Sequence, residues 1–295
     1  MSRETSPSSG RAYGLARVAR IWGVSRATIY RHRQISPEAP RRPGPIGPMP
    51  DDHLVAAIRR VLTASAFHGE GHRKVWARLR FAGVRTSRRR VLRLMREHAL
   101  LAHQRTGPAR GPRSHDGTIT TEQVDEMWGT DLTSVMTGEG LAAVFIAVDH
   151  CSAECIGIHA ARRATRFEAL EPIQQGVREH FGGFAKHIAA GLMLRHDHGS
   201  QYVSDNFQRE IAFLGIISSP AFVRAPEGNG CAERFIRTLK ENLLWVRDFA
   251  TIEDFRLALL EFRRRYNETW IVERHGYRTP VAIRAAQAQP AALAA

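Results

Sequence analysis

The sequence predicts an α/β protein in which all-helical modules precede a domain built on a mixed sheet. Apolar residues recur at helical spacing over the first hundred residues, whereas short strand-like apolar runs alternate with helical patterns from Val124 onward. Charge is divided in the same way: the first 120 residues contain 24 Arg and Lys against 7 Asp and Glu, and the remaining 175 contain 19 against 22. The basic part indicates a module that binds a polyanion.

Length and composition narrow the class of protein further. A chain of 295 residues predicts about two domains, and three cysteines are too few for a disulfide framework, which favours a reducing compartment. The polar start is not followed by an apolar run, so no signal peptide is expected. The longest apolar run, Leu141–Val148, has eight residues, which is too short to span a membrane. We therefore expect a cytoplasmic protein that does not bind membranes.

Residues 13–33 are predicted to form a helix-turn-helix after a disordered segment, 1–12. Gly23 would make the turn, and Ser25 would cap the second helix. One apolar stripe on the first helix consists of Leu15, Val18, Ala19 and Trp22. The second helix would present four residues to DNA, namely Arg26, Thr28, Arg31 and Arg33. The alternative is a small helical hairpin that does not bind DNA.

A second helical, helix-turn-helix-like module is expected at residues 51–101, between two linkers. The first linker, 34–50, has six prolines in its last fourteen positions, and the second, 102–120, is polar with Gly and Pro. Gly83 would turn the chain, and Ser87 would cap a helix. The exposed start of that helix carries Arg88, Arg89, Arg90 and Arg93. We expect these arginines to contact DNA phosphates rather than read bases.

The predicted catalytic core covers residues 121–250, and 251–295 would be a C-terminal helix and tail. The expected strands are Met127–Val135, Leu141–Asp149, Cys155–Ala160, Ile188–Leu194 and Ile216–Ser219. The expected helices are Arg166–His180, Ser204–Leu214, one that starts after Gly230, and Ile252–Tyr266. Asp149 would cap the turn after its strand, and the alanine-rich tail after Gln287 is expected to be loose.

Three acids stand at distinct places in this pattern. Asp131 lies within the first strand, Asp197 follows the fourth, and Glu233 lies in the first turn of the helix after Gly230. Carboxylate oxygens are the ligands that Mg²⁺ prefers, and two such ions can serve phosphodiester displacement. Without metal, clustered acids would repel one another. The three acids therefore predict a hard-metal site.

The motifs around these acids resemble those of a known family. They are Trp128-x-Thr130-Asp131-x-Thr133, Asp197-His-Gly-Ser-Gln-Tyr202, Asn229-Gly-Cys-Ala-Glu233-Arg-Phe235, Leu239-Lys-Glu241, Tyr266-Asn267, Arg274-His275 and Thr279-Pro280. In this order and spacing they resemble the DDE transposases of the retroviral-integrase superfamily, in particular those of the bacterial insertion-sequence-three family. The resemblance covers about residues 52–285.

The resemblance implies both a fold and a reaction. The fold would be ribonuclease-H-like, with the first and fourth strands adjacent, so that Asp131 lies beside Asp197. Asp131, Asp197 and Glu233 would be catalytic and hold two Mg²⁺ ions, for which Mn²⁺ would substitute. Water would cleave the element's ends, and the freed 3′-hydroxyl would attack target DNA without a covalent protein intermediate. The implied partners are double-stranded DNA, as terminal inverted repeats and target, and further copies of the protein.

Other residues of the predicted catalytic helix are expected to contact DNA. Glu233, Arg237 and Lys240 would share one helix face, so Arg237 and Lys240 would line the DNA. The alternative for Arg237 is an ion pair with Glu241. Asn229 is expected to cap the helix and to contact DNA.

Two features leave alternatives open. His196 stands where the family usually has a small hydroxyl residue. Zinc binding by His196, His198 and the distant cysteines is disfavoured because the ligand spacing is irregular.

A non-catalytic DNA-binding regulator and a metal-dependent nuclease that cuts without joining are the two rival functions. The terminal repeat sequence and the target preference do not follow from the sequence.

Overall fold

The computed structural model describes residues 3–33, 49–102, 119–221 and 229–288. Backbone contacts divide the chain into two units, Met1–Pro48 and Met49–Ala295, and each is considered by itself. Most of both predicted linkers, the end of the predicted tail and the segment 222–228 lie outside the described residues.

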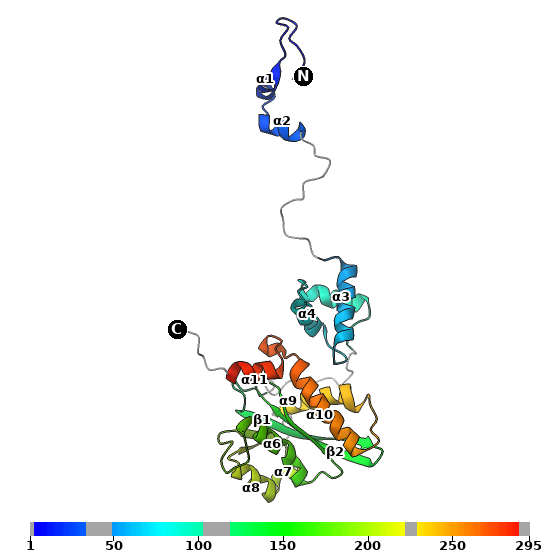
Figure 1. Cartoon of the computed structure of the whole chain (residues 1–295), viewed down its shortest axis with the longest axis vertical. Helices are drawn as coiled ribbons and strands as arrows, with labels where there is room; N and C mark the ends of the chain where they lie inside the picture. The colour runs from blue at the N-terminus through cyan, green and yellow to red at the C-terminus, as the bar shows by residue number, and fades with distance from the viewer. Residues whose placement is uncertain (1–2, 34–48, 103–118, 222–228, 289–295) are drawn as a thin grey trace, which may run out of the picture. The chain divides into compact units, whose positions relative to one another are not determined.

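The first unit contains the two helices predicted for a helix-turn-helix (Figure 1). They are α1 (Gly14–Ile21) and α2 (Arg26–Arg33), separated by a turn in which Gly23 has a φ of +64°. Ser25 accepts a hydrogen bond from the Thr28 N–H at 3.1 Å, as expected for an N-cap. Trp22 is 59 % exposed, so its assignment to the inward stripe was wrong. The helices are too short to enclose so large a ring.

Residues 49–102 form a three-helix module with its own apolar centre. Its helices are α3 (Asp51–Ala64), α4 (His72–Phe81) and α5 (Arg88–Glu97). The buried residues include Leu54, Ile58, Val75, Leu79, Val91 and Leu94. The predicted turn at Gly83 has a φ of +78°, and Ser87 caps α5 by accepting the Arg90 N–H. The helical pattern of the sequence is thus confirmed here.

A mixed five-stranded sheet forms the centre of the second unit, in the order β3-β2-β1-β4-β5. Its strands are β1 (Met127–Thr137), β2 (Gly140–Asp149), β3 (Cys155–Ala161), β4 (Met193–His196) and β5 (Ile217–Pro220). The first three are antiparallel, and β4 runs parallel to β1 and β5. The predicted neighbourhood of the first and fourth strands is confirmed, and the arrangement is ribonuclease-H-like.

The fourth strand is shorter than the sequence predicts. The apolar run Ile188–Leu194 enters the sheet only at Met193, because the chain turns at Gly191, which has a φ of +95°. Ala189 and Leu192 are buried all the same, so apolarity here reflects burial of a turn. Pairing of β1 with β4 extends over three residues on each strand and ends at Gly129 and Arg195.

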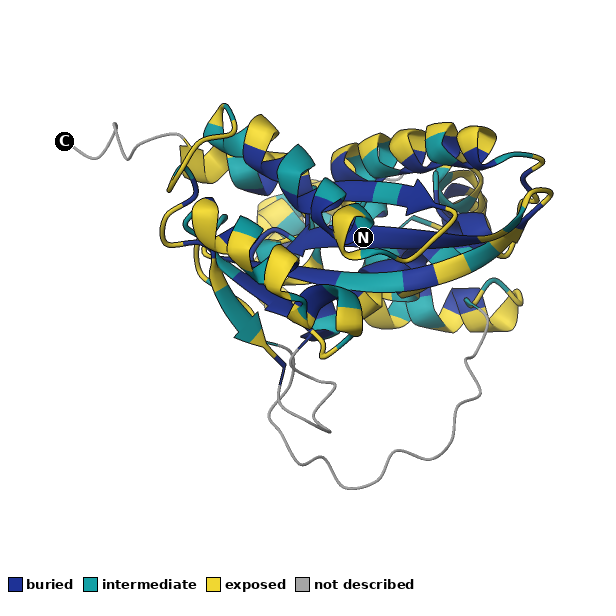
Figure 2. Ribbon diagram, turned by 90° about the horizontal axis from the view of Figure 1, so that it is seen from below, coloured by how far each residue is buried: buried dark blue, intermediate teal, exposed yellow. Residues whose placement is uncertain are grey.

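Helices cover both faces of the sheet (Figure 1). On one face lie α6 (Arg166–Phe181), α7 (Ser200–Val203) and α8 (Asp205–Phe213). On the other lie α9 (Gly230–Leu239), its π-helical continuation η2 (Lys240–Leu244) and α10 (Ile252–Thr269). Figure 2 shows the buried strands between helices whose outer surfaces are exposed. A last helix, α11 (Pro280–Ala288), and the short α7 were not predicted.

The three-helix module packs against the sheet domain through the loop that joins α3 to α4. The Phe67 ring lies among the rings of Phe262, Tyr266 and Trp270. The neighbouring His68 N–H donates to Asn242 Oδ1 in η2 at 2.7 Å. Phe67 thus belongs to the core of the sheet domain, and its loop joins the three-helix module to that domain within the second unit. Among the described residues, no helix is both long and apolar enough to cross a membrane.

Candidate active site

The side chain of Asp131 points to the face of the sheet that α9 covers. Trp128 and Leu132 on the same strand pack in the apolar cluster under α6, whereas Val135 packs in the cluster under α9 and α10. Because side chains alternate along a strand, Asp131 shares the side of Val135. Asp131 is partly buried, and its Oδ1 accepts the Leu132 N–H at 2.8 Å.

Asp197 is placed next to Asp131 by the register of the two parallel strands. The last pair of that ladder joins Gly129 to Arg195, and both acids follow two residues later. Asp197 lies just past the end of β4, where its Oδ1 accepts the Gly199 N–H at 2.8 Å. Residues two apart along a strand face the same side, so the register directs both carboxylates to the same place.

His196 holds the backbone from which Asp197 projects. Its Nδ1 lies 2.6 Å from the Asp197 carbonyl oxygen, and its Nε2 lies 2.9 Å from Ser218 Oγ on β5. These partners assign the proton to Nδ1, which donates to the carbonyl, while Nε2 accepts from the hydroxyl. The ring also stacks on Tyr202. The unusual histidine thus joins two strands, a reach that a small hydroxyl residue does not have.

Glu233 lies in the first turn of α9 and is exposed. The helix packs by the apolar face that the sequence predicts, which includes Ala232, Ile236, Leu239 and Leu243. Asn229 precedes this helix, but the prediction that its side chain caps α9 is wrong. It is buried instead, and its Nδ2 donates to the Thr130 carbonyl at 3.0 Å. Contact of Asn229 with DNA stays a prediction.

The protonation of Asp131 reflects its place between the other two acids. Burial and, to a smaller extent, the negative charges of Asp197 and Glu233 raise the pKa of Asp131 to about 6. The hydrogen bond from Leu132 and the positive charge of Lys240 act in the opposite direction. All four side chains therefore belong to one electrostatic site, although the sequence separates them widely.

The donor set of this site suits a hard divalent cation. Three carboxylates without a thiolate or imidazole are the ligands typical of Mg²⁺ or Mn²⁺. Within the described residues, however, no group of three or more Asp, Glu, His or Cys side chains is close enough to hold an ion. The residues fit the ion in chemistry, and binding requires their side chains to converge.

The two predicted basic contacts on the catalytic helix differ in their surroundings. Arg237 Nε lies 3.6 Å from a Glu241 carboxylate oxygen, so the alternative of an intrahelical ion pair is present. Lys240 instead lies close enough to the acids for its charge to lower the pKa of Asp131. It is the first residue of the π-helical turn η2, which the sequence did not predict. Such turns are frequent at functional sites.

The arginines predicted to contact DNA are only partly available for it. Arg90 and Arg93 both bind the Asp51 carboxylate, and Arg93 also pairs with Glu97. The Arg88 guanidinium lies over the Trp76 ring, 5.2 Å from its centre. The exposed members of the set are Arg26, Arg31, Arg33, Arg88, Arg89 and Arg93, whereas Arg90 is partly buried. Thr28 is half-buried, and its hydroxyl bonds Ser25 Oγ. Arg90 is thus the member most engaged within the module, and DNA contact by the others stays a prediction.

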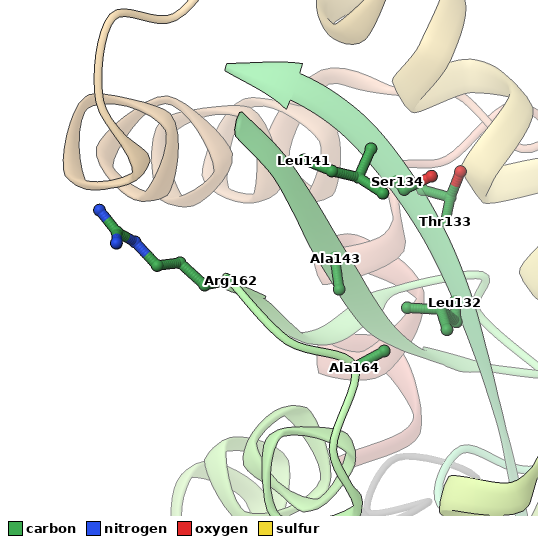
Figure 3. Close-up of a pocket in the computed structure, with 7 residues that line it drawn as sticks. All are labelled: Leu132, Thr133, Ser134, Leu141, Ala143, Arg162 and Ala164. Atoms are coloured by element: carbon green, nitrogen blue, oxygen red, sulfur yellow. The ribbon is translucent and has the colours of Figure 1, made fainter. Parts of the chain in front are cut away.

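A shallow pocket of about 440 Å³ lies on the strands beyond the acids and does not include them. Figure 3 shows its lining side chains, which come from β1, β2 and the segment after β3. The lining residues are Leu132, Thr133, Ser134, Leu141, Ala143, Arg162 and Ala164. Leu132 and Ala143 pack with the cluster under α6, so the pocket opens on the face of the sheet opposite Asp131. The pocket is therefore separate from the acids.

Two residues near the acids were missed by the sequence reasoning. His150, directly after β2, is buried, and its Nδ1 lies 2.9 Å from the Ile119 carbonyl oxygen. Gly129, two residues before Asp131, lies against His150 and Asn229. The only available indication was a histidine at the end of an apolar strand, which does not specify a function.

Parts of the chain are similar to known families and proteins. Residues 50–107 match a family described as an HTH-like domain, and residues 121–226 and 215–280 match two families described as the integrase core domain. The chain is 28% identical over 218 residues to the transposase InsD for insertion element IS2A/D/F/H/I/K of Escherichia coli, covering 71% of each chain. InsD for IS2D of E. coli strain K12 shows the same similarity.

Solved structures with detectable similarity include two integrases. The catalytic core of BIV integrase is 20% identical with a TM-score of 0.43, and the match covers 56% of this chain and 96% of that one. The HTLV-2 integrase core in complex with magnesium is 17% identical with a TM-score of 0.42, over 55% and 97% of the two chains.

Proposed function

Because this chain belongs to the DDE transposases of bacterial insertion sequences, we propose that Asp131, Asp197 and Glu233 are its catalytic acids. A transposase of this class cleaves DNA and transfers the cut strand to a new site. The observation that carries the assignment is the register of β1 with β4, which brings Asp131 and Asp197 together beside α9, the helix that bears Glu233. Like charges are gathered in this way where a cation is to be bound.

The three acids would hold two Mg²⁺ ions, with Mn²⁺ as a substitute. When bound, the ions polarise the phosphodiester and lower the pKa of the attacking oxygen. The three carboxyl groups must be ionised to bind the cations. The proton on Asp131 therefore has to leave before an ion binds. Lys240 partly offsets this charge and lies where it can also contact a DNA phosphate.

The backbone around the acids contributes by fixing their directions. His196 holds the carbonyl of Asp197, and the Leu132 N–H orients one oxygen of Asp131. Water would then hydrolyse a phosphodiester at each end of the element, and the freed 3′-hydroxyl would displace an oxygen of target DNA. One P–O bond is formed for each one broken, so no external energy source is needed for joining.

Recognition of the DNA ends would belong to the basic helical modules. The exposed arginines of α2 and Arg89 on α5 are the residues we assign to phosphate contacts. Arg237 and Lys240 would contact the DNA near the bond to be cut. Pairing of two ends would require more than one copy of the protein, and we propose an oligomer assembled on DNA.

The test is an in vitro reaction with the element's own ends. Labelled inverted repeats from the DNA that flanks the gene are incubated with Mg²⁺ or Mn²⁺ and with wild type or Glu233→Gln. We expect joined products from wild type only. The rate in the variant should fall at least about a thousandfold, as is typical when a catalytic group is removed, while both proteins should bind the ends nearly equally. Equal loss of binding and chemistry in the variant would contradict the assignment of Glu233.

The same reaction separates the two rival functions. Binding of the ends without cutting by wild type would identify a DNA-binding regulator. Cutting without joining would identify a nuclease. Only joined products that require the divalent ion support a transposase.

A further inference from the structure

A buried cluster joins the strand of Asp131 to the helix of Glu233. It consists of Gly129 on β1, His150 directly after β2 and Asn229 directly before α9. We propose that His150 and Asn229 are positioning residues, which hold the start of α9 against β1 and thereby set the direction of Glu233. This inference rests on the proposed role of the acids.

Asn229 makes the direct connection between the two catalytic segments. Its Nδ2 donates to the Thr130 carbonyl oxygen at 3.0 Å, within the backbone unit that leads into Asp131. Asn229 itself lies four residues before Glu233, about one helical turn away. It is 5 % exposed, so the hydrogen bond is shielded from water. One side chain thus fixes the distance between two segments that each carry an acid.

Gly129 provides the space in which the cluster fits. A Cβ atom at this position would lie 2.7 Å from His150 Nε2 and 2.8 Å from Asn229 Oδ1, closer than real Cβ atoms approach. Gly129 and Asp131 are two residues apart on one strand and therefore face the same side. Any side chain at residue 129 would push both polar groups away from the acids.

The two polar atoms that face Gly129 are both hydrogen-bond acceptors. The Nδ1 proton of His150 is directed to the Ile119 carbonyl, which leaves Nε2 with a lone pair. Among the described residues, neither Nε2 nor Asn229 Oδ1 has a hydrogen-bond partner, although both are buried. Two buried acceptors at one place require a shared donor, and the two O–H groups of a single water molecule would satisfy both.

The placement of His150 links this cluster to the rest of the sheet. Its backbone N–H donates to the Met127 carbonyl at 2.9 Å, and its own carbonyl oxygen accepts from Arg274. The backbone of His150 is therefore fixed on both sides, and its ring is held through Nδ1. Burial lowers the pKa of His150 to about 4, which keeps the ring neutral at pH 7. A neutral acceptor fixed in this way can hold a water against Asn229.

The first experiment compares two buried asparagines in the full-length protein. Asn267 is 7 % exposed, and its Nδ2 donates to the Cys155 carbonyl at 3.0 Å. Cys155 lies on β3, an edge strand that β2 separates from the acid-bearing strand β1. Binding of Mn²⁺ without DNA is measured by electron paramagnetic resonance, together with thermal unfolding, end binding and the kcat and KM of cleavage. Both Asn229→Ala and Asn267→Ala should lower the melting temperature.

Only Asn229→Ala should change the acid site. We expect its apparent Mn²⁺ dissociation constant to rise about tenfold, and kcat to fall while the KM for end DNA stays the same. Asn229→Asp keeps the shape but loses the donor, and it serves as the second variant if the alanine protein does not fold. If Asn229 variants bind Mn²⁺ as tightly as Asn267→Ala does, the inference is overturned.

The second experiment separates the two nitrogens of His150. The amide of His150→Asn takes the position of Nδ1, whereas that of His150→Gln reaches the position of Nε2. We expect the Gln variant to retain Mn²⁺ affinity and the Asn variant to lose several-fold. Equal affinities would overturn the role of Nε2. Gly129→Ala should weaken Mn²⁺ binding, whereas Gly138→Ala, where a Cβ would meet the Ala250 carbonyl at 2.5 Å, should not.

The measurements on wild type and on the variants test the transposase assignment and the positioning cluster separately. A wild-type protein that binds Mn²⁺ but neither cuts nor joins the ends would remove the transposase assignment. An active wild type whose metal binding is insensitive to Asn229 and His150 would remove the positioning cluster alone.

Discussion

At Asp131, burial favours the protonated carboxyl group, whereas the proposed metal binding requires the ionised one. Its pKa of about 6 means that the folded protein binds a proton there more tightly than the unfolded chain, whose reference pKa is 3.8. In the metal-free protein the stability from this proton is complete below pH 3.8 and is lost as the pH rises through about 6. A shift of this size corresponds to at most about 3 kcal/mol.

Metal binding should therefore depend on pH through Asp131. Below pH 6 the ion must displace a proton, so the apparent Mg²⁺ dissociation constant should rise about tenfold for each pH unit. Above pH 6 the constant should level off. Isothermal titration calorimetry between pH 5 and 8 measures this, and the number of protons released per ion should fall towards zero at the upper end. A flat profile would show that Asp131 is ionised throughout.

The sequence predicted the acids but not what surrounds them. Asp131, Asp197 and Glu233 stand out because each has a characteristic neighbour in the motifs, and the strand register then places two of them together. The roles of Asn229 and Gly129 depend on contacts between segments about one hundred residues apart. Capping preferences favoured the wrong role for Asn229, because tertiary contacts decided where its amide points.

At the scale of elements, helix α5 shows that charge alone does not identify a DNA contact. Arg90 is 21 % exposed and binds Asp51 on α3 and the Met49 carbonyl, so it joins two helices. Arg89, beside it, is exposed. Arg89→Ala should weaken end binding several-fold. It should also reduce the slope of log binding constant against log salt concentration by about one. Filter binding at several salt concentrations measures both quantities.

Arg90→Ala is the matched variant for that measurement. It should lower the melting temperature by a few degrees, because it breaks the connection between α5 and α3, and should change the salt dependence little. If both variants reduced the salt slope equally, Arg90 would leave Asp51 to bind DNA, and our distinction between the two arginines would be wrong.

Most elements followed from periodicity, and the exceptions have local causes. The helix α11 was missed although Thr279-Pro280 is a typical helix start, with the Thr279 hydroxyl accepting the Ala282 N–H. The strand before Asp197 was predicted too long because a buried turn is as apolar as a strand. The π-helical turn η2 depends on packing beneath it, which periodicity does not report.

At the scale of the whole second unit, the junction between the helical module and the sheet domain contains an unfavourable charge. Lys74 on α4 lies over the Trp270 ring, and its Nζ is buried without a hydrogen bond to the described residues. Burial lowers the pKa of Lys74 to about 7. The folded protein thus binds this proton less tightly than the unfolded chain, and stability should rise with pH above 7.

Lys74→Met should therefore stabilise the protein. We expect a gain of about 1–2 kcal/mol at pH 7, because a buried amine without partners is replaced by an apolar chain of similar length. The rise in stability between pH 7 and 9 should also disappear. Urea unfolding at both pH values tests this. A less stable variant would show that attraction between the ammonium group and the Trp270 ring outweighs the cost of burial.

The early end of the β1–β4 ladder has a consequence for how the site works. Asp131 and Asp197 lie beyond the last pair, Gly129 with Arg195, where the two strands separate. Backbone hydrogen bonds between the two strands therefore do not fix the spacing of the carboxylates. A continuous ladder would have set that spacing, whereas here it depends on the contacts around each acid, such as the bond from His196 to the Asp197 carbonyl.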